Sequence, residues 1–156
     1  MAVGAFQLVN TWGDQILQDA DTQWDATGTT LFAWLLLKST AAIVDTDSTV
    51  TDLGIAGTDW INTGDCAPID VITRSITFAA GDQEFKAGDA VFGPSVTITA
   101  RWICLIQGNA AAVVGGDGII GYQLLDTTPA DVSSTNSDFT VTAPTSNIWW
   151  QVNVQA

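Results

Sequence analysis

The sequence has no histidine and few basic residues. Without imidazole, the chain can assemble neither a Ser/His nor a Cys/His nucleophile, and zinc sites lose one of their usual ligands. Only four Lys and Arg residues stand against 17 Asp and Glu residues, which gives a formal net charge of -13. Because such a chain repels nucleic acid and anionic lipid, neither is expected as a partner.

The sequence also has no apolar run of the ~18 residues that a membrane-spanning helix needs. Its first ten residues, MAVGAFQLVN, carry neither a positively charged segment nor a long apolar core. They therefore do not resemble a secretory signal. We expect a protein made in the cytoplasm, with no membrane partner.

Only two cysteines are present, Cys66 and Cys104. They could form one bridge, but two cysteines in a domain of this size are not a disulfide framework. Cys104 lies on the apolar face of a predicted strand, which favours a buried free thiol over a disulfide.

The 156 residues suit a single domain, 1–156, with one substantial core. Charged residues make up 13% of the chain, and Thr, Ser and Gly are abundant. This balance is typical of β proteins whose exposed strand faces are uncharged and rich in hydroxyl groups.

The longest predicted strand spans residues 95–107, SVTITARWICLIQ. Its even positions are all apolar, while its odd positions change from Thr97, Thr99 and Arg101 to Ile103 and Leu105. The two-residue period predicts a strand that has one wet face at its start and two dry faces at its end. Such a strand passes from the surface into the core.

Other segments show shorter strand patterns bounded by turn residues. Residues 30–37, TLFAWLLL, predict a buried central strand, with a core helix turn as the alternative. A bend is expected at 87–89, and Gly93 and Pro94 are expected to close the segment that follows it. The remaining predicted strands are 70–78, 84–92, 119–126, 138–143 and 148–154.

These patterns predict an all-β, antiparallel sandwich or barrel, with jelly-roll topology left open. Thr11 and Asp14 resemble a capped first turn, so one short N-terminal helix is expected over residues 11–19. Residues 39–64, rich in Asp, Thr, Ser and Gly, predict a long irregular excursion over the surface.

We expect no catalytic residues, no cofactor and no metal. The alternating oxygen ligands of residues 45–52 resemble a calcium loop, but Val50 and Ala56 occupy the positions that require Gly and Glu. GGDG at 115–118 precedes a strand and lacks a neighbouring Lys, which favours a hairpin tip over a phosphate cradle. The acidic residues are scattered through turns, which argues against a glycosidase pair.

Seven tryptophans are the unusual enrichment. Trp34, Trp102 and Trp150 lie on apolar strand faces and are expected in the core. Trp60, in a loop, and Trp149, among polar neighbours, are candidates either for partner contact or for packing under a long loop. Arg101, a rare basic residue, is the third candidate interface position.

Four segments resemble a group of small virion structural proteins from tailed bacteriophages: MAVGAF at 1–6, FKAGDAVF at 85–92, ITARWICLIQ at 98–107 and GYQLLDTTPADV at 121–132. The chain departs from that pattern between residues 38 and 73. The resemblance implies a β-rich, non-enzymatic cement or decoration protein that is made in the host cytoplasm and assembled onto the virion.

This resemblance implies the major capsid protein or other virion proteins as partners. A homo-oligomer is also expected, with a trimer favoured by closed symmetry. The alternatives are a neck, tail or baseplate protein and, with less support, a carbohydrate-binding module that stacks sugars on Trp60 or Trp149.

Overall fold

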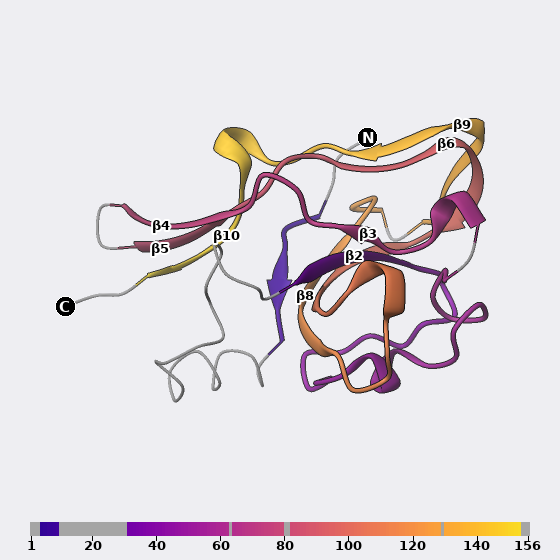
Figure 1. Cartoon of the computed structure of the whole chain (residues 1–156), viewed down its shortest axis with the longest axis horizontal. Helices are drawn as coiled ribbons and strands as arrows, with labels where there is room; N and C mark the ends of the chain where they lie inside the picture. Colours follow the sequence, from indigo (N-terminus) through magenta and orange to yellow (C-terminus); the bar gives the residue numbers. More distant parts are fainter. Residues whose placement is uncertain (1–3, 10–30, 63, 80–81, 129, 154–156) are drawn as a thin grey trace.

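The computed structural model describes residues 4–9, 31–62, 64–79, 82–128 and 130–153. Within these ranges, ten strands form three antiparallel sheets, joined by turns and short 3-10 helices (Figure 1). The prediction of an all-β fold is confirmed. The helix predicted over 11–19 lies outside the described residues, and no helix inside them is long and apolar enough to cross a membrane.

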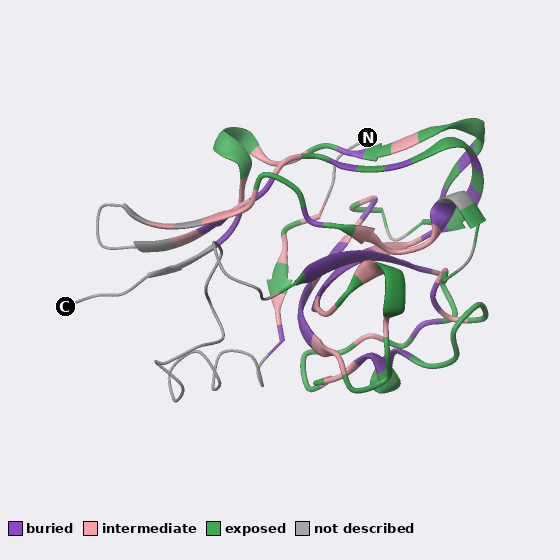
Figure 2. Cartoon of the chain, in the orientation of Figure 1, coloured by how far each residue is buried: buried purple, intermediate pink, exposed green. Residues whose placement is uncertain are grey.

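The largest sheet has five strands in the order β1-β8-β7-β2-β3. Its central strand β2, Phe32–Leu37, is buried at every residue (Figure 2), which confirms the predicted buried strand. Its sequence, FAWLLL, is apolar on both alternations because both of its faces are covered. The other strands are β1 (Gln7–Leu8), β8 (Gly118–Leu124), β7 (Trp102–Gln107) and β3 (Ile69–Asp70).

The strand predicted over 95–107 is two strands. β6, Ala90–Ala100, belongs to a two-stranded sheet, whereas β7 belongs to the five-stranded sheet, and the chain bends between them at Arg101. The predicted change in burial is confirmed, because β6 alternates buried and exposed residues and β7 is buried over its middle four. The prediction that Gly93 and Pro94 end a segment is wrong, since β6 runs through them.

β9, Val132–Val141, is the only strand that pairs with β6 in the described residues, and Figure 1 shows the two running side by side as a long ribbon. β9 begins six residues before the strand predicted at 138–143. The run SSTNS has a composition typical of a loop, yet it pairs with β6 through two register shifts. One shift lies near Asn136, whose φ of 52 is left-handed.

The third sheet has the order β10-β5-β4. Its strands are β4 (Ser75–Ala79), β5 (Asp82–Lys86) and β10 (Ile148–Asn153). The strand predicted over 70–78 is therefore split, and Thr73, with φ 50, lies in the break. The predicted bend at 87–89 is confirmed, and it separates β5 and β6 into different sheets.

The excursion over residues 39–64 carries core side chains as well as exposed ones. It contains the 3-10 helix η1, Val50–Leu53, and reaches η2, Gly64–Cys66. Val50, Leu53 and Trp60 are buried and belong to the hydrophobic core. Two further 3-10 helices are η3 (Ala110–Ala112) and η4 (Thr145–Asn147).

Candidate interaction surface

The outer face of the β6–β9 ribbon is exposed and carries one charged residue, Asp138. Alternation along both strands buries one face, with Val96, Ile98 and Ala100 among its residues, and leaves the other to solvent (Figure 2). We call the outward-facing exposed residues the hydroxyl face, because most carry hydroxyl groups; they include Val91, Thr97, Thr99, Ser133, Thr135, Asp138 and Thr140.

Side-chain hydrogen bonds across the ribbon hold part of the hydroxyl face in place. Thr99 Oγ1 and Ser133 Oγ lie 3.0 Å apart, and the two residues are direct partners in the strand register. Asn136 donates its backbone N–H to Thr97 Oγ1 at 3.2 Å, at the register shift. These bonds order the hydroxyl groups without adding charge.

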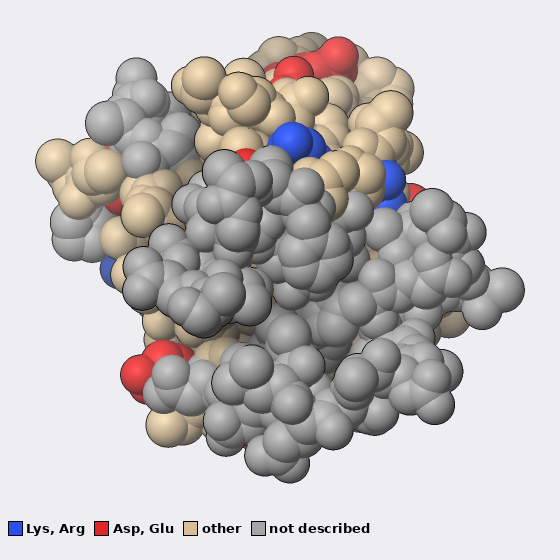
Figure 3. Space-filling view, turned by 90° about the vertical axis from the view of Figure 1, so that its left-hand side faces the viewer, with Lys and Arg blue, Asp and Glu red and all other residues tan. Residues whose placement is uncertain are grey.

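Asp138 is the only charged residue in β6 or β9. Its Oδ1 accepts the backbone N–H of Ser95 at 3.3 Å, so this carboxylate is used within the ribbon. Figure 3, which views the molecule from the side, shows the described charged atoms in small separate groups, with acidic atoms at the top of the view. In a protein of net charge -13, the hydroxyl face carries a single carboxylate, which limits its repulsion of an acidic partner.

The ribbon also has an open strand edge, on β9. β9 has one strand partner among the described residues, and its ten residues include neither Lys nor Pro. Natural proteins usually protect exposed edges with such residues, because an open edge pairs with other chains. The register shift near Asn136 and the exposed carboxylate of Asp138 protect this edge in part.

Arg101 fixes the ribbon to the five-stranded sheet. Its backbone N–H donates to Leu37 O at 2.8 Å, and its carbonyl accepts from Leu125 N at 2.9 Å. Its side chain donates through Nε to Asp131 Oδ1 at 2.8 Å and lies 5.6 Å from the centre of the Trp102 ring. Arg101 is therefore an anchor at the base of the ribbon.

Trp60 and Trp149 are both buried, with 6% and 3% of their surface exposed. Trp60 belongs to the excursion and is buried there, so of the two sequence-based alternatives, partner contact and packing, the structure shows packing. The prediction that Trp149 lies on a polar face is wrong: it contacts Trp34 at 4.4 Å between ring centres. A register shift between Ile148 and Trp150 breaks the alternation of β10, so Trp149 and Trp150 both reach the core.

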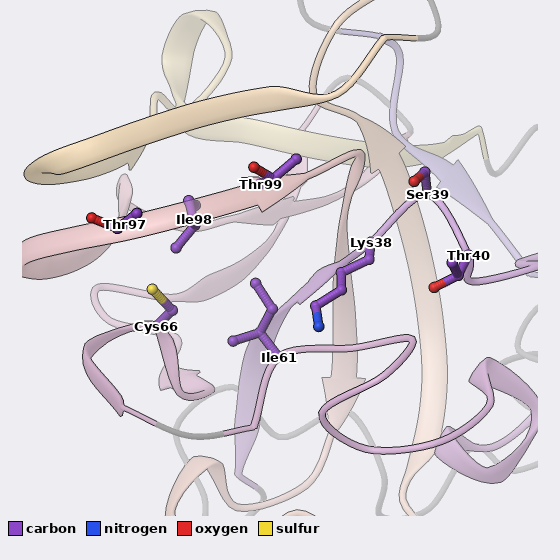
Figure 4. Close-up of a pocket in the computed structure, with 8 residues that line it drawn as sticks. All are labelled: Lys38, Ser39, Thr40, Ile61, Cys66, Thr97, Ile98 and Thr99. Atoms are coloured by element: carbon purple, nitrogen blue, oxygen red, sulfur yellow. The ribbon is translucent and has the colours of Figure 1, made fainter.

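A cleft of about 390 Å³ separates the ribbon from the loop that follows β2. Figure 4 shows Ile98 pointing from β6 toward Cys66 and Ile61, while Thr97 and Thr99 point away. Lys38 lies at the same cleft, and its Nζ donates to Gly57 O at 2.6 Å. The cleft thus combines apolar walls with a lysine that already has a partner in the protein.

In residues 45–52, which we call the acidic loop, carboxylates accept hydrogen bonds from nearby backbone N–H groups. Asp52 Oδ2 accepts the backbone N–H groups of Ser48 and Thr49, each at 2.9 Å, and these bonds lower the Asp52 pKa. Burial of Asp47 raises the pKa of that carboxyl. No group of three or more Cys, Asp or Glu suited to a metal ion occurs in the described ranges.

The GGDG segment is docked on this acidic loop. Gly115 O accepts both the backbone N–H of Thr51, at 3.0 Å, and Thr51 Oγ1, at 2.9 Å. Asp117 O accepts Val50 N at 2.9 Å. The segment is thus a hairpin loop with its polar groups directed to neighbouring protein.

Cys66 and Cys104 are buried, and no disulfide joins them. Complete burial of Cys104 raises the pKa of its thiol well above the ordinary value. The prediction of a free thiol at Cys104 is confirmed.

Sequence reasoning missed the β9 half of the hydroxyl face. The available signal was the order of residues 132–141, in which Val132 and Val141 bracket a hydroxyl-rich run. Its pairing depends on β6, more than thirty residues away, so local pattern did not reveal it.

No protein family model, curated protein or solved structure matched the chain.

Proposed function

We propose that this chain is a non-enzymatic virion structural protein that binds and stabilises the capsid shell of a tailed bacteriophage, as a cement or decoration protein. Its partners would be the major capsid protein or other virion proteins, with further copies of the chain forming a homo-oligomer, a trimer by preference. The protein would be made in the host cytoplasm and act on the virion.

The hydroxyl face of the β6–β9 ribbon is the observation that carries this proposal. It is exposed, ordered and carries only one charged residue, Asp138, in a strongly acidic protein, and the β9 edge offers backbone groups for strand addition. Contact through this ribbon would bury hydroxyl and backbone groups with few charges to desolvate. Arg101 would support the contact by anchoring the ribbon rather than by meeting the partner.

The architecture that we propose for the domain is an antiparallel sandwich in which the ribbon covers one side of the core. Val96 and Ile98 on the inner face of β6 are buried, and they belong to the same hydrophobic cluster as β2 and β7. This arrangement would leave the hydroxyl face outermost, where a shell protein could reach it.

Stabilisation would follow from binding linkage. A protein that binds the assembled shell and not the free subunits adds its binding free energy to the assembled state. At a free concentration 100 times the dissociation constant, each bound site would contribute about 2.7 kcal/mol. Summed over a shell, this amount would resist the pressure of packaged DNA.

The test is co-sedimentation of the purified chain with virions and empty shells grown from the phage genome that encodes it. The double variant Thr135→Glu with Thr140→Glu places two carboxylates on the hydroxyl face and should weaken binding at least tenfold. Its matched control, Thr46→Glu with Thr127→Glu, adds the same charge at exposed sites elsewhere and should bind like the wild type. Equal binding by both variants would exclude the ribbon as the contact.

A neck, tail or baseplate position is the second candidate, because an open β edge serves those assemblies equally well. Gold labelling of virions through a C-terminal tag separates the two, and label confined to the tail would overturn the shell assignment. The carbohydrate-binding alternative required exposed rings on which sugars could stack, and the two proposed rings, Trp60 and Trp149, are both buried.

A further inference from the structure

A cavity of about 600 Å³ opens at the seam between the five-stranded sheet and β10, away from the ribbon. Its walls come from the segment before β1, from β8, from the link between β9 and η4, and from β10. The described side chains that line it include no charged group. It is large enough for a ring-sized organic group.

Gln123 of β8 lines this cavity and is only 4% exposed. Its Oε1 has no hydrogen-bond partner among the described residues. Buried polar atoms nearly always have a partner, so an orphaned acceptor at a cavity wall marks a place where a donor would bind. An occupant with an N–H or O–H group would satisfy it.

Aromatic and apolar groups form another part of the wall, and Thr142 and Thr145 also line the cavity. Phe6 and Trp149 meet edge to face, with ring centres 6.4 Å apart, and Pro144 and Ile148 lie beside them. The Phe6 ring lies against Gly121, so a side chain at position 121 would collide with that ring. The indole N–H of Trp149 already donates to Ala87 O at 3.1 Å, so it does not compete for Gln123.

We propose that this cavity, which we name the Gln123 pocket, binds an uncharged aromatic group that carries one hydrogen-bond donor, such as an indole. The aromatic walls favour a planar apolar body, and the unpaired Gln123 acceptor, beside the hydroxyl groups of Thr142 and Thr145, favours a hydrogen-bond donor. An anionic ligand would meet a protein of charge -13 with no basic group in the described lining. This inference concerns a different part of the molecule and does not depend on the proposed virion function.

The experiment is an NMR titration of the full, ¹⁵N-labelled chain with indole and with 1-methylindole, which has the same ring but no N–H. We expect indole to shift the amide signals of Gly4, Phe6, Gln123 and Trp149, and to bind three- to tenfold more tightly than 1-methylindole. Equal affinities, or no binding of either probe, would overturn the proposal. This comparison uses the wild-type chain and does not depend on a variant folding.

Two variants test the role of the amide. Gln123→Leu removes the acceptor and should bind both probes equally, whereas Gln7→Leu, at an exposed position of β1, should keep the preference for indole. A preference that persists in Gln123→Leu would also overturn the proposal. Titration with N-acetyl-tryptophanamide, a larger probe, identifies the source of the ligand. If this probe binds, the ligand is a tryptophan side chain of a protein. If only indole binds, the ligand is a free small molecule.

Discussion

Arg101 and Asp131 join the bend between β6 and β7 to the start of β9, with Nε and Nη2 of the guanidinium both 2.8 Å from Asp131 Oδ1. The two side chains are 28% and 33% exposed, so solvent screens their attraction only in part. The pair closes the base of the ribbon at the point where the chain changes sheets.

A double-mutant cycle measures this relationship. Arg101→Met keeps the packing of the side-chain stem and removes the charge, and Asp131→Asn removes the partner. We expect each single variant to lower the free energy of unfolding, with a coupling energy of about 0.5–1 kcal/mol that decreases in 1 M salt. Urea unfolding at low and high salt is the measurement, and strictly additive effects would show that the pair contributes nothing.

Trp149→Phe should destabilise the protein by about 2 kcal/mol, because it leaves Ala87 O without its buried donor and opens space beside Trp34. Trp102→Phe, at a half-buried position, is the matched control and should cost less. Urea unfolding followed by circular dichroism compares them. A cost for Trp149→Phe no larger than the control would mean that the indole contributes little beyond its ring.

Thiol labelling should distinguish the two cysteines. Cys104 is fully buried in β7 and its pKa is raised by burial, so it should react with iodoacetamide only after unfolding. Cys66 lines the cleft beneath β6 and should react first in the native protein. Mass spectrometry of peptides after timed labelling at pH 8 gives both rates; native labelling of Cys104 at the rate of Cys66 would contradict this burial.

The Asp52 carboxylate should contribute to stability in a pH-dependent way. Two backbone N–H donors lower its pKa below the ordinary 3.8, so the contribution is present above that value and disappears as the pH falls through the folded-state pKa. Asp52→Ala should therefore be less stable than wild type at pH 7, with a difference that shrinks toward pH 2. Asp70→Ala removes another exposed carboxylate as the control. If the stability difference between Asp52→Ala and wild type did not change with pH, the stabilisation would come from uncharged contacts of Asp52 and not from its charge.

The sequence predicted the elements whose burial pattern is local. β2 is apolar on both faces and was identified directly, and the passage from half-buried β6 to buried β7 follows from the residues at even and odd positions. The bend at Arg101 was not predicted, because the alternation continues across it without a Gly or Pro to mark the change of sheet.

The candidate surface was less accessible to sequence reasoning. Exposure of Trp149 was inferred from strict alternation, and a single register shift in β10 reversed it. The hydroxyl face depends on pairing between strands distant in sequence, and the Gln123 pocket depends on the meeting of both ends of the described chain with β8. Long-range pairing and bulges decide such features, and neither leaves a local pattern.

The anchor at Arg101 also has a mechanical consequence. A tension applied at the far end of the ribbon would reach the five-stranded sheet through the Arg101 backbone bonds to Leu37 and Leu125. Because Leu37 ends the most buried strand, that tension would be carried by the core rather than by a surface loop. In single-molecule pulling through residues at the ribbon tip and in β2, we expect Arg101→Met to lower the rupture force, because it removes the side-chain pair with Asp131 that supports these backbone bonds, while leaving β2 itself folded.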